Sequence, residues 1–282
     1  MKKTFSIFLL LSFLLNVKSQ VVISSSQDNS NQAFEASEVD TIDVCLLKVQ
    51  YRMEHIKDTK NSNQKKHYFM LLQIGDKISK FTDYFGLKVD SMQFLYAKQK
   101  MSFTEVVNRT MPIYLGTSRI NIYKRHPASD KMTVTDRIPF AGNFKYTEGI
   151  IKFNWKLQEG ANTICGYKCK KATTTFRGRN YTVWYTPSIP NSEGPWKFNG
   201  LPGLILKVAD DKNDYSFECV AIEKGKKNEY IYIKDRDYFS TSREQFNITA
   251  KNAYDNPSAY GEAAGIQTIS LKTRPYNPIE LE

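Results

Sequence analysis

Hydrophobic and polar residues alternate along much of the chain between residues 43 and 240, and turn-forming residues interrupt the alternation roughly every 8–12 positions. In the segment 43–55 the apolar residues occupy alternate positions, which is typical of a half-buried strand. The segment 67–84 contains two such runs on either side of Gly75-Asp76, and this pattern predicts a β-hairpin. The regular succession of short strands favours a mainly β, antiparallel architecture.

The same pattern continues through the middle of the chain and is interrupted by two helical segments. Residues 88–108 carry apolar side chains at roughly helical intervals, and residues 242–255 form a second helical segment that Ser242 is able to cap. The last ~20 residues carry no periodic pattern, so we expect them to be irregular. The remaining strands are expected at 120–125, 131–138, 144–149, 151–158, 167–176, 181–187, 205–210, 214–224 and 229–239.

The N-terminus has the three-part layout of a secretory signal peptide. Lys2 and Lys3 precede an apolar run at residues 4–15, and the small-residue exit predicts cleavage between Ser19 and Gln20. The apolar run is shorter than the ~20 residues of a membrane-spanning helix, and no later segment approaches that length. We therefore expect an exported protein, periplasmic or extracellular.

The sequence predicts three regions. Residues 1–19 are the signal peptide, and residues 20–40, rich in Ser, Asn and Gln, are expected to be a flexible leader. Residues 41–282 carry the β pattern with no internal repeat and no linker, so we expect them to form a single domain.

Charge adds one constraint on partners. The chain has 40 Lys and Arg against 29 Asp and Glu, and loss of the three signal-peptide lysines lowers the net charge from +11 to +8. Such a charge keeps a protein soluble, and it also favours anionic partners such as acidic glycans or lipid headgroups. Nucleic acid is not expected as a partner of an exported protein, and neither a membrane-spanning role nor an oligomeric state is indicated.

Four cysteines lie in the expected mature chain, at Cys45, Cys165, Cys169 and Cys219. Export permits disulfides, and four cysteines allow three connectivities. If Cys165 and Cys169 share one extended strand, they lie about 13 Å apart, too far for a bridge unless Gly166 bends the chain. Pairing each of them with Cys45 or Cys219 is then favoured, and buried free thiols or a zinc site are the alternatives.

Catalytic and cofactor motifs are scarce. The three histidines, His55, His67 and His126, show no metal-binding spacing, and the chain has no serine-hydrolase elbow and no phosphate-binding glycine loop. We expect no metal, no cofactor and no catalytic residue. A glycosidase needs only two carboxylates across a cleft, so a hydrolase using an unidentified pair stays an alternative. The segment 210–214 has a calcium-like composition but is better interpreted as an acidic hairpin tip.

Arginine and aromatic residues alternate between residues 176 and 198. Such side chains stack on sugars or hold anionic groups by cation–π contacts, although cross-strand packing in a sheet explains the same pattern. The candidate ligand-binding residues, called the Arg–aromatic cluster below, are Arg177, Arg179, Tyr181, Trp184, Tyr185 and Trp196.

The stretch that follows, GPWKFNGLPGLILKV at 194–208, is dense in glycine, proline and apolar residues. Pro202 and Gly203 occupy the central positions of a four-residue turn from Leu201 to Leu204, which predicts a type II turn leading into a buried strand. Gly200 directly precedes this turn and is expected to be part of it. The stretch contains no nucleophile, so we interpret Gly200, Pro202 and Gly203 as a structural turn.

These residues carry a family resemblance. Residues 165–208 resemble the signature region of the GLPGLI family of exported proteins, found chiefly in Bacteroidetes, whose biochemical function is not established. The matching positions are Gly166-Tyr167, Cys169, Lys171-Ala172, Gly178-Arg179, Trp184-Tyr185, Ile189-Pro190, Gly194-Pro195, Gly200 and Leu201 to Ile205. A similar module precedes some exported deglycosylating enzymes as a bowl-shaped domain. The resemblance implies one curved, bowl-like or half-barrel antiparallel sheet with one or two short helices and an open concave face.

The sequence therefore favours a non-catalytic binding or interaction protein of the cell envelope, whose concave face receives a peptide, glycan or lipid. The alternatives are an envelope glycan hydrolase and an assembly partner of an outer-membrane protein.

Overall fold

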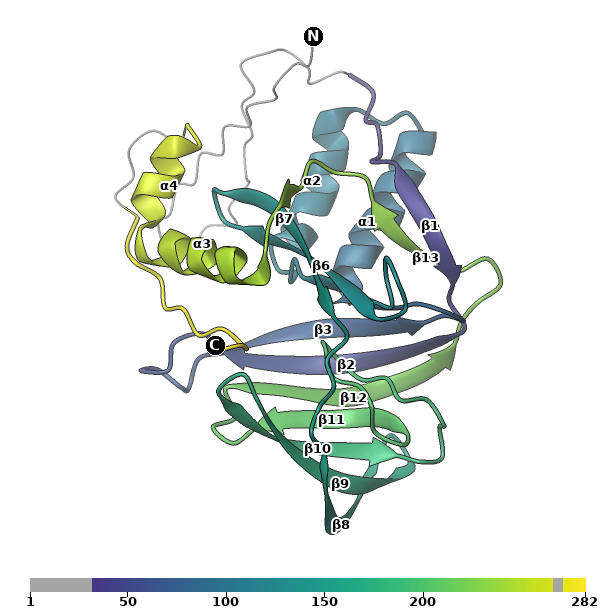
Figure 1. Cartoon of the computed structure of the whole chain (residues 1–282). Helices are drawn as coiled ribbons and strands as arrows, with labels where there is room; N and C mark the ends of the chain where they lie inside the picture. Colours follow the sequence, from purple (N-terminus) through teal and green to yellow (C-terminus); the bar gives the residue numbers. More distant parts are fainter. Residues whose placement is uncertain (1–31, 266–270) are drawn as a thin grey trace.

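The computed structural model describes residues 32–265 and 271–282. Its main element is a twelve-stranded sheet, drawn in Figure 1, with the strand order β14-β7-β6-β5-β4-β3-β2-β12-β11-β10-β9-β8. Neighbouring strands are antiparallel except for the β14–β7 pair. The expected mainly β fold with a large open antiparallel sheet is confirmed. The expected signal peptide, 1–19, and most of the expected leader lie outside the described residues.

The strands are short and follow one another through short turns, as the hydrophobic pattern predicts. Their bounds are β1 Val39–Val44, β2 Leu47–Ile56, β3 Lys65–Ile74, β4 Ser79–Asp83, β5 Asn121–Lys124, β6 Lys131–Ile138, β7 Gly142–Gly149, β8 Lys156–Ile164, β9 Tyr167–Phe176, β10 Arg179–Thr186, β11 Leu204–Asp210, β12 Tyr215–Lys224, β13 Tyr230–Lys234 and β14 Phe239–Ser240. β1 and β13 pair with each other in a separate small sheet. β1 includes Val39 and Asp40, the last residues of the segment expected to be a leader.

Four helices flank the sheet, where the sequence predicts one or two. They are α1 Tyr84–Lys98, α2 Phe103–Tyr114, α3 Arg243–Asp255 and α4 Pro257–Ala263. In Figure 1, α1 and α2 lie side by side on one side of the molecule and α3 and α4 on the other. Within the described residues, the helices are all too short or too polar to cross a bilayer.

The single helix expected at 88–108 is wrong, because the chain breaks between α1 and α2. Lys100 has a positive φ of 54°, which a helix does not allow. Ser102 then starts α2 with a capping box, in which its side chain accepts from the Glu105 amide and the Glu105 side chain accepts from the Ser102 amide.

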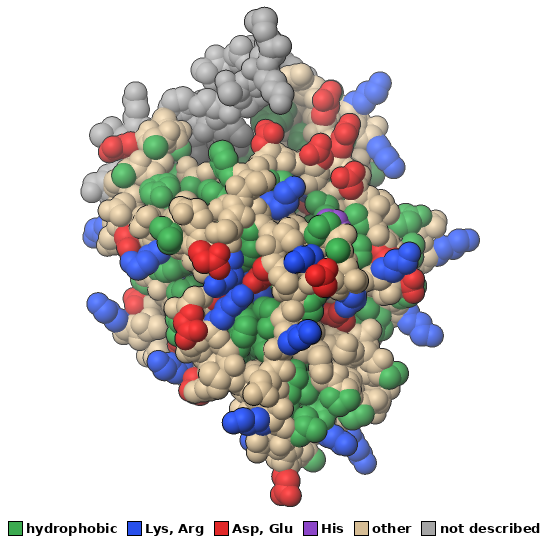
Figure 2. All heavy atoms as spheres, viewed as in Figure 1, with side chains coloured by type: hydrophobic (Ala, Val, Ile, Leu, Met, Phe, Trp, Pro, Cys, Tyr) green, Lys and Arg blue, Asp and Glu red, His purple; other side chains and the backbone are tan. Residues whose placement is uncertain are grey.

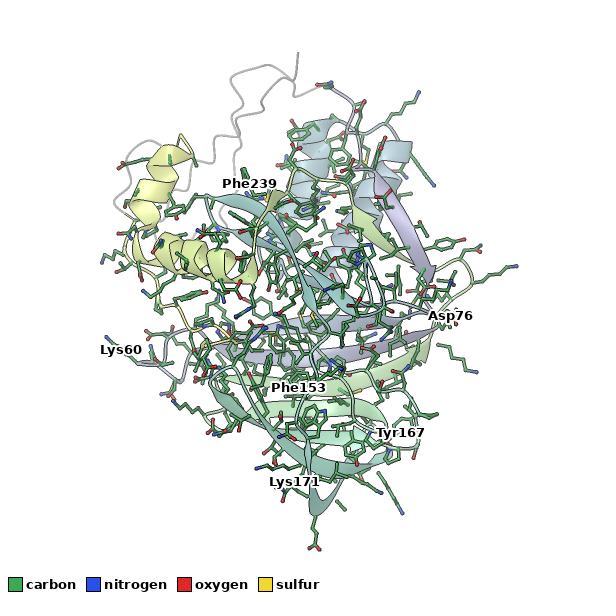
Figure 3. The ribbon with its side chains drawn as sticks, viewed as in Figure 1. Lys60, Asp76, Phe153, Tyr167, Lys171 and Phe239 are labelled. Carbon is green, nitrogen blue, oxygen red and sulfur yellow. The ribbon has the colours of Figure 1, made fainter. Side chains whose placement is uncertain are left out.

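The sheet is strongly curved. In Figure 1 the strands β3, β2, β12, β11, β10 and β9 lie side by side, β6 and β7 lie above them, and the irregular chain between β7 and β8 runs down in front of them. One hydrophobic core joins the two ends of the sheet, β4 to β7 and β2 with β8 to β12. It contains buried residues from both ends: Tyr51 on β2, Phe81 on β4, Val134 on β6 and Val183 on β10. Figure 3 shows Phe153 among the side chains in the middle of the molecule, with Lys60 and Asp76 at its edges.

The stretch 194–208 fills much of the space inside this curve. Trp196, Phe198, Leu201 and Leu204 are at most 3 % exposed and belong to the main core. The Phe198 ring packs against Phe153, with ring centroids 5.2 Å apart. The apolar side chains of this loop therefore pack where the sequence leads us to expect an open concave face.

Candidate functional site

The Arg–aromatic cluster lies mostly within the protein. Tyr181, Tyr185 and Trp196 are 2–3 % exposed and pack in the main core. Trp184 points to the other face of β10, where it is half-buried beside Gly160 of β8. Tyr181 and Tyr185 thus lie on one face of β10 and Trp184 on the other, as alternation along a strand requires, while Trp196 comes from the loop before β11.

Arg179 is 3 % exposed, and its two terminal nitrogens are bound by the chain while its Nε has no hydrogen-bond partner among the described residues. Its Nη1 donates to Asp210 and Asp214 at 2.8 and 3.0 Å, and its Nη2 donates to the Asn277 side chain and the Pro278 carbonyl. Burial alone lowers the pKa of Arg179, but the two carboxylates outweigh it and raise the pKa above its ordinary value. The segment 210–214 does form the turn between β11 and β12, with residues 211–213 exposed, while Asp210 and Asp214 are ion-pair partners of Arg179.

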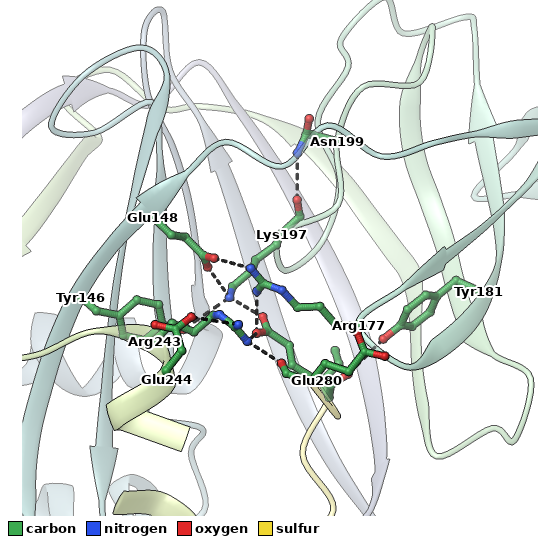
Figure 4. A network of polar contacts seen from close by, with 11 residues as sticks. Tyr146, Glu148, Arg177, Tyr181, Lys197, Asn199, Arg243, Glu244 and Glu280 are labelled. Carbon is green, nitrogen blue, oxygen red and sulfur yellow. Dashed lines mark hydrogen bonds and ion pairs between the residues drawn. The ribbon is translucent and has the colours of Figure 1, made fainter. Parts of the chain in front are cut away.

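Arg177 belongs to a second buried network, drawn in Figure 4. It donates to Glu148 at 2.7 Å and to Glu280 at 2.6 Å. Lys197 is 1 % exposed and pairs with the same two carboxylates, and Arg243 adds a third cation to Glu280. Burial raises the pKa of Glu148, but Lys197 and Arg177 more than reverse this and hold the pKa below its ordinary value.

The segment 277–281 lies along these arginines. Tyr181 donates to the Ile279 carbonyl at 3.2 Å, and the Leu281 amide donates to the Arg177 carbonyl at 3.0 Å. Together with the contacts of Arg179, these bonds engage Arg177, Arg179 and Tyr181 with the protein's own chain. A ligand-binding role of the cluster stays a prediction.

The turn residues have special backbone geometry. Gly200 and Gly203 have positive φ values of 91° and 147°. The Gly203 amide donates to the Leu201 carbonyl, and the Leu204 amide donates to Ile189, so the turn closes over three residues and is not the type II turn that the sequence predicts. A Cβ at Gly203 would lie 2.2 Å from the Thr186 carbonyl oxygen, which leaves space only for glycine.

A polar cavity of about 70 Å³, unrelated to any local motif, lies between the helix pair α1–α2, strands β4 to β7 and the segment after β13. This polar cavity is lined by eight charged side chains: Lys80, Asp83, Asp90, Arg119, Asp136, Arg137, Lys234 and Arg236. Since one buried water needs roughly 10–15 Å³, the space suits a small oxyanion group or a few waters.

Cations outnumber acids in the polar cavity, five against three. Asp90 is already paired with Lys234, and Asp83 accepts from the amides of Gly86 and Ser118, both at 2.9 Å. In the described part of the chain, Arg119 Nη1 is buried without a hydrogen-bond partner. The Arg119 guanidinium lies 3.1 Å from the centroid of the Tyr114 ring, so its Nη1 is a buried donor of the cavity without an acceptor among the described residues.

Two groups in the polar cavity have strongly altered proton affinity. Burial lowers the pKa of Lys80 to about 7, an effect that Asp90 opposes and Lys234 and Arg236 increase. Burial raises the pKa of Asp136 to about 7. The ammonium of Lys80 donates to the Tyr232 carbonyl at 2.9 Å and lies 4.2 Å from the centroid of the Tyr232 ring.

Sequence reasoning missed this cavity because its residues are spread from Lys80 to Tyr238 and meet only when the sheet is assembled. Surface charge gives no better signal: in Figure 2 basic and acidic side chains are interspersed over the visible face. Within residues 32–265 and 271–282, no group of three or more His, Cys, Asp or Glu side chains is placed to hold a metal ion.

Comparison with known proteins adds a family match and a fold likeness. Residues 175–207 match the model of a family described as a protein of unknown function (Porph_ging). No curated protein matches the chain. Two solved structures of PNGF-II, in the P21 and C2 space groups, are similar at 15 % and 13 % identity with TM-scores of 0.46 and 0.45; each likeness covers 75 % of this chain. The chain spans about a third (34 %) of the length of those proteins.

Proposed function

We propose that the protein is an exported, non-catalytic binding protein of the cell envelope that holds an anionic group in the polar cavity. The observation that carries the proposal is the excess of cations there, with the buried Nη1 of Arg119 unpartnered. A buried donor without a partner costs free energy, and an oxyanion supplies the missing acceptor. The positive net charge of the chain favours the same partners.

The ligand class follows from the size and chemistry of the cavity. A single carboxylate, phosphate or sulfate group fits the space, so the ligand is an acidic glycan, peptide or lipid whose anionic group enters while the rest stays outside. We also propose membership of the GLPGLI-type family, which the match at residues 175–207 supports.

Calorimetric titration tests the proposal with inorganic phosphate and galacturonate as anionic probes and galactose as the neutral control. We expect both anions to bind and galactose not to bind. Burial sets the pKa of both Lys80 and Asp136 to about 7, so raising the pH removes positive charge and adds negative charge in the cavity; for galacturonate, whose own charge is constant from pH 6 to pH 8, affinity should be strongest at pH 6 and weaken by pH 8. If neither phosphate nor galacturonate binds at pH 6, the proposal is wrong.

Variants locate the site. Arg119→Gln and Lys80→Met each remove one charge from the polar cavity and should weaken anion binding about tenfold to hundredfold. Lys168→Ala removes an exposed lysine and should leave affinity unchanged. Trp184→Ala reports on the Arg–aromatic cluster: loss of binding in this variant, with Arg119→Gln unaffected, would place the ligand at the cluster and overturn the assignment to the cavity.

The export proposal has its own test. The basic head and the apolar run at 4–15 are recognised by the secretion machinery. Intact-mass analysis of the protein recovered from native cells should give a chain beginning at Gln20, in the periplasmic or extracellular fraction. A chain that retains residues 1–19 in the cytoplasmic fraction would show that the segment is not a cleaved signal peptide.

A further inference from the structure

The hairpin between β8 and β9 turns on Cys165 and Gly166. Their φ values, 49° and 80°, are both positive, as in a type I′ turn. Asn, Asp and Gly are the residues that favour this turn, and a thiol does nothing to stabilise a positive φ. The conformation of the hairpin therefore does not explain why a cysteine stands at its tip.

The tip of this hairpin touches a strand that is not its neighbour. Cys165 Sγ lies 3.1 Å from the carbonyl oxygen of Cys219 on β12, 54 residues away in the chain. β10 and β11 stand between β9 and β12 in the sheet, a separation of about 14 Å if the sheet were flat. The curvature of the sheet brings the two cysteines together.

The two thiols differ in access. Cys165 is exposed, whereas Cys219 is 4 % exposed and lies next to a register shift in the β12–β2 pairing. Burial, and after it the neighbouring thiol of Cys165, raises the pKa of Cys219 well above its ordinary value. Cys165 is thus the thiol that a soluble reagent reaches first.

The other two cysteines make different contacts. Cys169 is buried in the same main core as Cys219, and its Sγ faces the Tyr167 carbonyl at 3.3 Å. Cys45 packs with Ile78 and Ile231 in a small hydrophobic cluster of its own. The sequence leaves several cysteine pairings open. In the described part of the chain, Cys165 and Cys219 are the one pair joined by a hydrogen bond.

We propose that Cys165 and Cys219 form a redox pair, which a small disulfide oxidant such as oxidised glutathione converts to a disulfide that clamps the β8–β9 hairpin to β12. This inference is independent of ligand binding in the polar cavity.

The reaction proceeds by two thiol–disulfide exchanges. The Cys165 thiolate attacks one sulfur of oxidised glutathione, the S–S bond of the oxidant breaks, and one glutathione thiolate leaves. The Cys219 thiolate then attacks Cys165 Sγ, and the second glutathione thiolate leaves. Two protons pass from the protein thiols to the leaving thiolates, and two electrons pass to the oxidant, which is reduced to two molecules of glutathione.

Alkylation and mass spectrometry test the pair in the purified full chain. Reduced protein, denatured and alkylated, should take up four alkyl groups, one for each cysteine. After incubation with oxidised glutathione it should take up two, and peptide mapping should find Cys165 joined to Cys219. Closure should accelerate between pH 7 and pH 9, because a larger fraction of Cys219 becomes thiolate.

Four single variants complete the experiment. Cys219→Ser should retain a glutathione adduct on Cys165. Cys165→Ser, whose hydroxyl can still donate to the Cys219 carbonyl, should form neither adduct nor bridge. Cys45→Ser and Cys169→Ser are the matched controls and should form the bridge as the parent does. A bridge from Cys165 to Cys169, or a stable Cys165 adduct in the parent that never closes, would overturn the proposal.

Discussion

At the scale of single residues, buried charges fix the shape of the 194–208 stretch. Lys124 on β5 is 1 % exposed and pairs with Glu193 at 2.8 Å. Its ammonium also donates to the carbonyls of Gly194 and Phe198, at 3.0 and 2.8 Å. One lysine therefore satisfies two carbonyls of the part of the stretch that precedes β11, which ties this part to β5.

Gly203 carries the sharpest residue-scale prediction. Replacement by alanine puts a Cβ 2.2 Å from a backbone oxygen and also imposes a φ of 147° on an L-residue. Because neither the Thr186 backbone nor the turn is free to move, Gly203→Ala should lower the free energy of unfolding by about 3 kcal/mol or more. Urea denaturation followed by fluorescence measures the change.

Gly166→Ala is the control for Gly203→Ala. Its φ is also positive, 80°, but an added Cβ meets no atom within 4 Å. The backbone strain alone should cost about 1–2 kcal/mol. If Gly166→Ala and Gly203→Ala lower the free energy of unfolding equally, the close approach of Gly203 to Thr186 does not affect stability.

At the scale of elements, the sequence predicts well what short-range chemistry decides. The hairpin at Gly75-Asp76 forms as expected, with Ile74 opposite Ser79. α3 begins after Ser242, whose side chain accepts from the Gln245 amide at 3.1 Å, as the expected cap does. In both cases the turn or cap residue and the periodic pattern beside it are contiguous in the chain.

Elements and sites that depend on distant residues were not predictable in the same way. The expected strand at 151–158 starts only at Lys156, because Phe153 and Trp155 pack into the core instead of extending the sheet. The polar cavity and the partners of Arg179 involve residues far apart in the chain, for which periodicity gives no signal. The break before α2, in contrast, was predictable from the sequence, since Ser102 and Glu105 have the spacing of a capping box.

At the scale of the whole molecule, the curved sheet stays open at its edges, and ion pairs connect its two halves. Glu280 in the irregular C-terminal segment contacts Arg177 between β9 and β10, Lys197 in the loop before β11 and Arg243 on α3. Glu148 on β7 contacts two of the same cations. The strands at opposite ends of the sheet order are thus joined through a segment that has no regular structure itself.

Glu280→Gln tests this connection. The variant leaves Arg177 and Lys197 with Glu148 as their one shared carboxylate and leaves Arg243 with the exposed Glu244. An uncompensated buried charge costs about 3–5 kcal/mol. Hydrogen exchange should therefore accelerate in β7 and in the β9–β10 hairpin together, while the β3–β4 hairpin keeps its protection. Glu244→Gln removes an exposed partner of Arg243 and should change the free energy of unfolding by less than about 1 kcal/mol. If exchange rises in β7 alone, the network does not couple the two halves, and hydrophobic packing in the shared core alone holds them together.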